Sequence, residues 1–412
     1  MSAVDQGRQI SEFYDNYARL SHTNYSMIYQ YRDLDSFWNI IDSDSFWASN
    51  ARFSNDKAEQ TMGIQELKKL LNDSEKERLK LEDCYIICFC KKDDKLSQWR
   101  GYAKNGVSIG FDFHAVLPFY VDKKIRIYNS CYDVNYIKKD LPLDELEYTF
   151  KVTRDENGNL TKLPQHIPYI KHAGFEEEEE CRLVFFNKSG SIDSYVHYRE
   201  GSRHERIPYI KVGLKSEDDD KKNCTIRLLI GKSPVSGQKV SDIYDIIKNR
   251  TMALNAKVIS CFDPEMSSTS CKEHDDVACW GCSQRLINPM KDCSQNYEYQ
   301  ECGYTKNMGF CPETARNYIA NKDLNYIMIS AGKNQEAVFK VVDQIITEYN
   351  NEITLEDNKI SVWCEGHLPI RTITVGPLEN REEIKESIEH YCRNHYWLKY
   401  VKVKMSSIPY RS

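Results

Sequence analysis

The sequence predicts an α+β fold, with mixed or split antiparallel sheets, flanking helices and a second, smaller α/β unit. Three observations predict it. Apolar and β-branched runs of strand length recur along the chain, and no run approaches the roughly 18 apolar residues that cross a bilayer. Amphipathic segments of helix length lie between these runs. A strand-strand-helix-strand order occurs twice, once before and once after a cysteine-rich stretch.

The first half of the chain contains a regular series of elements. Residues 1–26 are expected to be an N-terminal arm with a short helix. A helix at 35–42 is predicted because Asp33 or Asp35 can cap it, and leucines set among lysines and glutamates predict an amphipathic helix at 65–80. The other predicted elements of this half are strands at 27–32, 45–48, 84–90 and 107–113, and a short helix at 97–103.

A polar, turn-rich stretch at 129–172 separates this half from the next. Apolar strands follow at 181–186, 209–212 and 226–230. The segments 206–264 and 359–411 then share one order of elements, which suggests a duplication, although this unit is also common by chance. In the second segment we expect strands at 360–364, 370–375 and 400–405 and a helix at 381–394; in the first, a helix at 241–249 and a closing strand at 256–261.

These patterns predict how the chain divides into domains. The 412 residues exceed one typical domain of about 100 to 200 residues. We expect the arm at 1–26, a domain at 27–265, a cysteine-rich insert or linker at 266–325, and a C-terminal α/β unit at 326–412 that repeats the 206–264 element and contains a strand at 326–330 and a helix at 335–349.

Composition and charge narrow the class of protein. Hydrophobic residues make up 41% and charged residues 29%, which is typical of a globular protein. The net charge of −6 gives no broad electrostatic footprint for nucleic acid. The polar N-terminus lacks a signal-peptide pattern, and several of the 15 cysteines lie in apolar runs. We therefore expect a soluble, cytoplasmic protein with no membrane partner.

An acidic strand start is the main candidate for chemistry. Alternate residues of a strand share a face, so Glu178, Glu180 and Arg182 are expected to point together. Crowded carboxylates raise each other's pKa and a neighbouring guanidinium lowers it. A carboxylate pair of this kind suits cleavage of a ribosyl bond through an oxocarbenium-like transition state. The alternative is structural, because residues 176–180 are five consecutive glutamates and a charge run is usually a solvated face.

Six short motifs occur in order along the first domain: Tyr31-Arg32, Phe53-x-Asn55-Asp56-x-x-Glu59, Cys88-Phe89-Cys90, Trp99-x-x-Tyr102-Ala103, Gly106-x-x-Ile109-Gly110-Phe111-Asp112 and Phe175-x-x-Glu178-x-Glu180-x-Arg182. Together they resemble the bacterial domain-of-unknown-function family numbered 2971, over about 27–264, with its closing element repeated at about 358–412. Cys90 stands where that family usually has serine. The resemblance implies the domain and no activity.

The order of these residues is also similar to that of the ADP-ribosyltransferases. That likeness implies that Glu180 bonds the nicotinamide ribose of NAD and stabilises the developing cation, while Glu178 orients the acceptor. The remaining roles that it implies are phosphate or ribose binding by Arg32 and Tyr31, Cys90 at the serine or threonine position, Tyr102 or Trp99 stacked on nicotinamide, and a second ligand loop at Asn55-Asp56. The alternatives are core packing for Trp99 and Tyr102 and a turn or cap for Asn55-Asp56.

The cysteine-rich insert could hold a structural zinc ion. Cys279 and Cys282 have the two-residue spacing with which both thiolates reach one tetrahedral metal. Cys302 and Cys311 could complete the set, although they lie nine positions apart. The alternatives are a redox pair and unconnected thiols in a loop-rich segment. No cluster of basic residues accompanies them, so a zinc-finger role in nucleic-acid binding is not indicated.

Three functions from different classes fit these observations. The first is a bacterial ADP-ribosyltransferase-like or NAD-cleaving effector of a toxin or antiviral defence system, acting on a protein or RNA acceptor. The second is a ligand-binding or protein-interaction module of a defence or regulatory complex, in which the duplicated unit serves assembly into a homo-oligomer or with a partner. The third is an RNase-type effector that uses Glu178 and Glu180.

Overall fold

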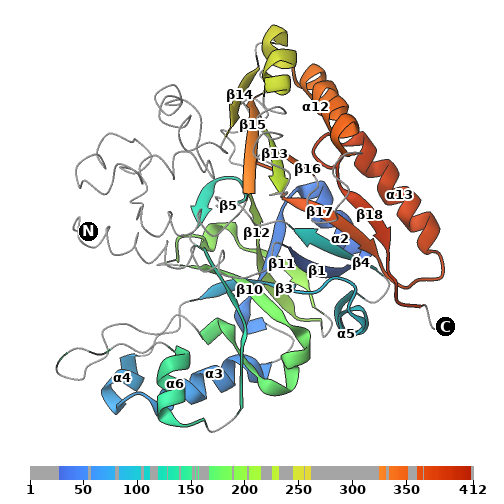
Figure 1. Ribbon diagram of the computed structural model, residues 1–412. Coiled ribbons are helices and arrows are strands. Elements are labelled where there is room, and N and C mark those ends of the chain that lie inside the picture. Colours follow the sequence, from blue (N-terminus) through green and yellow to red (C-terminus); the bar gives the residue numbers. More distant parts are fainter. Residues whose placement is uncertain are drawn as a thin grey trace.

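The computed structural model describes residues 27–53, 57–78, 83–103, 106–111, 119–127, 129–138, 141–150, 154, 156, 167–187, 190–201, 204–214, 225–231, 245–254, 256–260, 324–330, 334–350, 360–364 and 366–409. Strands and helices are mixed along this part of the chain, which confirms the predicted α+β class (Figure 1). The N-terminal arm and the cysteine-rich insert lie outside these residues. A search of the described helices finds none with the length and apolar character of a membrane span.

Within the described residues, the larger sheet contains 12 strands. They are, in spatial order, β18 (Lys402–Met405), β17 (Ile370–Val375), β4 (Gly106–Phe111), β1 (Ile28–Asp33), β3 (Cys84–Cys90), β2 (Phe46–Asn50), β12 (Arg206–Gly213), β5 (Phe119–Val121) and β6 (Ile125–Ile127), with β10 (Glu180–Phe186) and β7 (Asn129–Asp133) beside β3 and β11 (His197–Glu200) beside β12. Apart from the parallel pair β17–β18, neighbouring strands of this sheet are antiparallel.

The sheet splits beside β3. One edge of β3 pairs with β10 along its whole length, from Cys84 to Cys90. Its other edge meets β1 only where Cys90 faces Tyr29, and meets β2 only at Tyr85 and Ile86. Since a strand has two edges, β1 and β2 share this one and leave the middle of β3 unpaired between them. We call this gap the seam.

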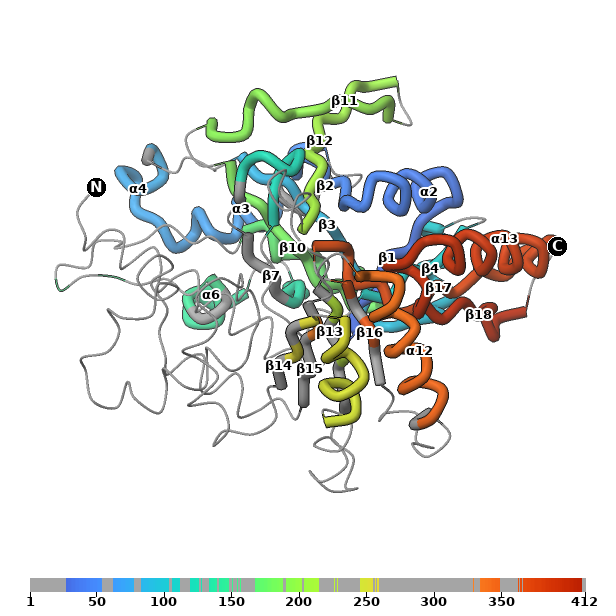
Figure 2. Tube along the Cα trace, turned by 90° about the horizontal axis from the view of Figure 1, so that it is seen from above, coloured from blue at the N-terminus to red at the C-terminus, as the bar shows by residue number. Residues whose placement is uncertain are grey.

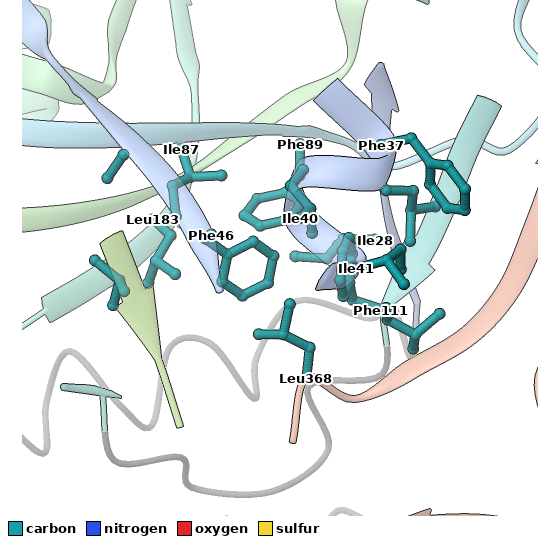
Figure 3. Close-up of a cluster of buried hydrophobic side chains, with 14 of the residues drawn as sticks. Ile28, Phe37, Ile40, Ile41, Phe46, Ile87, Phe89, Phe111, Leu183 and Leu368 are labelled. Carbon is teal, nitrogen blue, oxygen red and sulfur yellow. The ribbon is translucent and has the colours of Figure 1, made fainter. Parts of the chain in front are cut away.

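One face of the large sheet carries the main hydrophobic core. Helices α2 (Leu34–Ser43) and α13 (Arg381–Asn394) cover it side by side, with the rings of Trp38 and Tyr391 5.1 Å apart (Figure 2). Side chains from β2, β3 and β4 meet below them, where the ring of Phe46 lies 4.9 Å from that of Phe111 (Figure 3). Burying each such side chain contributes about 1.5 to 3 kcal/mol. The predicted cap of α2 is confirmed, since the Asp33 carboxylate accepts from the backbone N–H of Ser36 at 2.7 Å.

A second sheet has the strand order β14 (Lys257–Ser260), β15 (Leu324–Ser330), β13 (Thr225–Gly231), β16 (Ile360–Cys364). Helix α12 (Gln335–Asn350) packs on it through Val338, Val342 and Ile345, which share one helix face. This unit lies at the opposite end of the molecule from α3 (Lys57–Lys69), α4 (Asp73–Arg78) and α6 (Leu143–Phe150) (Figure 1).

The two similar segments occur with the same element order but pair differently. In the first, β12 belongs to the large sheet while β13 and β14 lie in the small one, with β15 between them. In the second, β16 belongs to the small sheet while β17 and β18 are direct neighbours in the large one. Both sheets therefore contain strands from both predicted units. The domain boundaries themselves stay a prediction.

One expectation about local structure was wrong, and one polar stretch holds more regular structure than its composition indicates. The expected helix at 65–80 is broken into α3 and α4 because Asn72 starts a new helix: its side chain accepts from Glu75 N and its N–H donates to the Glu75 carboxylate, both at 2.9 Å. The polar, turn-rich stretch at 129–172 contains, among its described residues, β7, β8 (Asn135–Ile137), α6 and β9 (Ile170–His172). Leu146 and Phe150 of α6 pack in one cluster with Leu67 of α3 and with Leu70 and Leu71, which follow that helix, a long-range contact that the polar local composition hides.

Short helices connect these elements. They are the 3-10 helices η1 (Ala51–Phe53), η3 (Ile167–Tyr169), η4 (Ala173–Glu178), η6 (Asp193–Tyr195) and η8 (Met252–Leu254), the short α5 (Leu96–Gln98), and the single π-helical turn η2 (Trp99–Ala103). A segment at 245–251 is also helical.

Candidate functional site

A pocket of about 250 Å³ opens at the seam. Four consecutive residues of β1, from Tyr29 to Arg32, line it, although neighbours on a strand point to opposite faces. The pocket therefore reaches into the gap between β1 and β2 and does not lie on one face alone. Strands β9, β10 and β11 and the short helix η4 supply further walls.

One side of the pocket is a closed network of charges, which we call the acidic corner: Glu178, Glu180, Lys171 and Arg182. Arg182 holds Glu180 with two hydrogen bonds, from Nε at 2.8 Å and from Nη2 at 2.9 Å. Lys171 donates to both glutamates, at 3.2 Å to Glu180. Glu180 and Arg182 are 5% and 4% exposed, so this network is desolvated and tightly fixed.

Glu178 belongs to a different element from the one that the sequence predicts. It was expected on the strand with Glu180, but β10 begins only at Glu180 and Glu178 ends η4. Glu179 between them has a φ of 45°, a left-handed conformation that terminates the helix and turns the chain into the strand. The Glu178 carboxylate accepts from the Tyr102 hydroxyl at 3.0 Å.

Electrostatics keep Glu180 ionised. Burial alone would raise its pKa, but the charge of Arg182, its hydrogen bonds and the charge of Lys171 outweigh burial and hold the pKa of Glu180 below its ordinary value. The backbone N–H of Glu180 also donates to the Tyr136 hydroxyl at 2.8 Å. Burial first, and Glu178 next, raise the pKa of the Tyr102 hydroxyl, which therefore stays protonated and donates a hydrogen bond to Glu178.

Another part of the pocket wall carries two arginines, Arg32 of β1 and Arg199 of β11, which we call the arginine pair. Arg199 donates to the Ser49 hydroxyl at 2.9 Å, and the Nε atoms of both arginines are buried without a hydrogen-bond partner. Burial, and after it the charge of Arg199, lowers the pKa of Arg32. Among the described residues, no carboxylate lies within ion-pair distance of either guanidinium.

Gln30 adds a buried amide to the same wall. Its side chain is 2% exposed, and both its Oε1 and its Nε2 lack a hydrogen-bond partner in the described part of the protein. An unpaired buried amide costs about 1 to 3 kcal/mol. Gln30 and Arg32 are two positions apart on β1 and therefore share a strand face.

The aromatic candidates separate into pocket and core. Tyr31 and Tyr102 line the pocket, and Tyr102 is 44% exposed. The Tyr31 hydroxyl is occupied, since it donates to the carbonyl of Lys92 at 3.0 Å and accepts from Lys95 N at 2.8 Å. Trp99, by contrast, is 2% exposed and packs edge-on against Tyr31, so its predicted stacking on a ligand is replaced by core packing.

Cys90 also lines the pocket, where a hydroxyl would stand in the resembled families. Burial raises the pKa of its thiol to about 11, so it is a neutral thiol at physiological pH. Its backbone faces Tyr29 across the one point where β1 and β3 pair. Cys90 therefore contributes a small apolar wall and no thiolate.

Residues Ser406, Ser407 and Ile408, which we call the C-terminal clasp, lie behind Tyr31 in the pocket wall. The Asp94 carboxylate accepts from the Trp99 indole at 2.9 Å, from the hydroxyl of Ser406, and from both the N–H and the hydroxyl of Ser407, at 2.7 and 2.6 Å. Ile408 then packs against the cluster that contains Tyr31 and Trp99. These donors outweigh burial and lower the pKa of Asp94.

Several predicted site residues lie outside the described residues: Asn55, Asp56, Cys279, Cys282, Cys302 and Cys311. The ligand loop and the zinc site predicted for them stay predictions. Across the part of the chain that the structure describes, no group of three or more histidine, cysteine, aspartate or glutamate side chains could hold a metal ion.

Three of the charged or polar residues on which the pocket depends were not predicted from the sequence. Gln30 could have been found, because it is a polar side chain inside a strand whose neighbours predict burial. Lys171 carries a similar signal, since it follows the apolar Ile170. Arg199 has no local signal, because β11 approaches the pocket only through its pairing with β12, which pairs in turn with β2.

Comparisons with known proteins cover one part of the chain. The model of the family described as "Protein of unknown function (DUF2971)" matches residues 98–183, a stretch that includes Tyr102 and the whole acidic corner. The expected resemblance to that family is thereby confirmed over these residues. No curated protein and no solved structure matches the chain. The likeness to ADP-ribosyltransferases remains a prediction.

Proposed function

For a chain whose residues 98–183 match DUF2971, we propose an ADP-ribosyltransferase-like or NAD-cleaving activity. One observation carries this proposal. Arg32 and Glu180, which lie on β1 and β10 and are far apart in the sequence, line the same pocket. A guanidinium that can bind phosphate and a carboxylate that can stabilise a ribosyl cation are thus within reach of one ligand.

The charge state of Glu180 suits this chemistry. Cleavage of the bond between ribose and nicotinamide develops positive charge on the ribose ring, and a carboxylate fixed in a desolvated site stabilises that charge without having to reorganise. Arg182 holds Glu180 ionised and immobile. Glu178 and Tyr102 lie nearer the solvent, at 14% side-chain and 44% residue exposure, where an acceptor group could approach them.

The size of the pocket sets how much of the ligand it takes. A volume of about 250 Å³ is below the roughly 300 to 1,000 Å³ of sites that enclose a whole drug-sized ligand. The pocket therefore fits one end of a dinucleotide, and the other end would extend past η4 or β11. Described cysteines such as Cys90 and Cys392 form no disulfide, which supports a reducing, cytoplasmic setting for an effector of this kind in toxin or defence systems.

Nicotinamide release from NAD by the full chain tests the proposal. We expect Glu180→Gln to lower the rate by about 100-fold or more, because it removes the charge that faces the transition state. Glu200→Gln is the matched control, since Glu200 is exposed and pairs only with the exposed His204 in the described structure. Circular dichroism would verify that Glu180→Gln stays folded. Unchanged turnover in a folded Glu180→Gln variant would contradict the proposal.

A specific observation favours a second function, a non-catalytic ligand-binding module. Both oxygens of Glu180 already accept hydrogen bonds from Arg182, and Lys171 adds another. In this second function the carboxylate of Glu180 holds the pocket wall and takes no part in a reaction. Calorimetric titration with NAD, with the nucleotide analysed afterwards, separates the two functions, because a module binds NAD and leaves it intact.

A further inference from the structure

We infer that the pocket binds a dianionic group of the phosphate class between Arg32 and Arg199, with the Gln30 amide as an additional donor. This inference deepens the proposed function and rests on it only for the nucleotide part of the ligand. The dianion is either an internal pyrophosphate or a terminal phosphate monoester, and both present the same chemistry to the two guanidinium groups.

The balance of charge in the pocket leads to a dianion. Among the described lining residues, the acidic corner contributes two positive and two negative side chains that pair with one another. The arginine pair adds two further positive charges. A ligand that restores neutrality must therefore carry about two negative charges, which a carboxylate does not supply and a phosphate monoester or a pyrophosphate does.

Asp33, the carboxylate next to Arg32 in the sequence, caps helix α2 and does not pair with Arg32. Asp33 acts on Arg32 electrostatically, but less strongly than burial or Arg199 do. Its side chain accepts from Ser36 N as the cap of α2, and it is exposed. Asp33 therefore stabilises the helix start and leaves the face of the guanidinium toward the pocket open to a ligand.

Unpaired donors point to the same group. The Nε atoms of Arg32 and Arg199 and the amide of Gln30 are buried without partners, and Arg199 is positioned by its bond to Ser49. Buried N–H donors normally make a hydrogen bond, so several unpartnered donors in one pocket indicate that a ligand with several acceptor oxygens binds there. A phosphate group provides three or more such oxygens, and arginine binds it with two parallel hydrogen bonds.

Binding of inorganic pyrophosphate and of inorganic phosphate to the full chain, measured by calorimetry, tests this inference. We expect pyrophosphate to bind with an affinity that falls as ionic strength rises, and Arg199→Gln to weaken it at least about tenfold. Arg199→Lys should be intermediate, because it retains the charge and loses the bidentate geometry. Arg393→Gln on the remote helix α13 is the matched control and should bind as the wild type does.

A second variant keeps the test decisive if Arg199→Gln unfolds. Gln30→Glu has nearly the same shape and places a carboxylate on the strand face that carries Arg32, so it should abolish pyrophosphate binding while retaining the wild-type melting temperature. Tighter binding of ADP-ribose, which has an internal pyrophosphate, than of ribose 5-phosphate, which has a terminal phosphate, would assign an internal pyrophosphate, and the reverse a terminal phosphate.

The outcomes separate this inference from the proposed function. If pyrophosphate binding depends on Arg199 but the protein does not turn over NAD, the anion site is supported and the proposed enzymatic activity is contradicted. If the protein turns over NAD and the KM for NAD is unchanged in Arg199→Gln, the anion site is contradicted and the proposed enzymatic activity is supported. An absence of pyrophosphate binding at millimolar concentration likewise overturns the inference.

Discussion

The acidic corner and the arginine pair line the same pocket but differ in how their charges are satisfied. In the acidic corner, Glu180 has a partner for each oxygen, and Lys171 bridges it to Glu178. In the arginine pair, Arg32 and Arg199 face the pocket with unpaired Nε atoms. A buried charge with all its partners organises the structure, whereas one without them is stabilised by a ligand. The contrast makes four predictions.

The largest effect is expected from breaking the acidic corner. Arg182→Met removes the bidentate partner of Glu180 and leaves a buried carboxylate uncompensated, which should cost about 3 to 5 kcal/mol of unfolding free energy. Chemical denaturation measures it. The double variant with Glu180→Gln should be less destabilised than the sum of the two single variants, and strict additivity would mean that the two residues do not act as a pair.

Lowering the pH should reduce the stability that the acidic corner contributes to the folded protein. The pKa of Glu180 is lowered from its ordinary value of 4.5 in the folded protein, so the stability that it contributes is present above 4.5 and is lost as the pH falls through the lower, folded value. We expect the melting temperature of the wild type to fall in this range and that of Glu180→Gln to fall less. Parallel curves for the two proteins would show that Glu180 titrates alike in the folded and unfolded states.

Removing a charge from the arginine pair should change the free energy of unfolding in the opposite direction to removing one from the acidic corner. Arg32→Met removes a partly buried charge that lies next to Arg199, so it should stabilise the free protein by about 1 kcal/mol while abolishing anion binding. Thermal denaturation with and without pyrophosphate measures both effects. If Arg32→Met destabilised the protein as much as Arg182→Met, the contrast between the two parts of the pocket would be lost.

The smallest effect is expected at the solvent-facing edge of the corner. Tyr102→Phe removes the hydrogen bond to Glu178 from a residue that is 44% exposed, which should cost only about 0.5 kcal/mol. The ring remains, so binding of an aromatic base is expected to persist in Tyr102→Phe and to weaken in Tyr102→Ala. Equal affinities for the two variants would exclude stacking on Tyr102.

The sequence was informative where local periodicity decides the structure. Alternation along a strand correctly predicted that Glu180 and Arg182 share a face. It was wrong for Glu178, because the left-handed Glu179 ends a helix there, and a run of identical residues carries no signal for that turn. The same limit applies to Arg199, whose position depends on the register of two strand pairs that local sequence does not specify.

The C-terminal clasp has a consequence for when the pocket forms during synthesis. Tyr31 and Trp99 are made about 300 residues before Ser406 and Ser407, which bond to Asp94, and before Ile408, which packs against the cluster that contains Tyr31. Strand β17, which covers the outer edge of β4, also comes from this late part of the chain. Because a nascent chain folds in the order in which it leaves the ribosome, β1 stays incompletely supported until residues 370–408 have been made. A partly made chain would then have no working pocket.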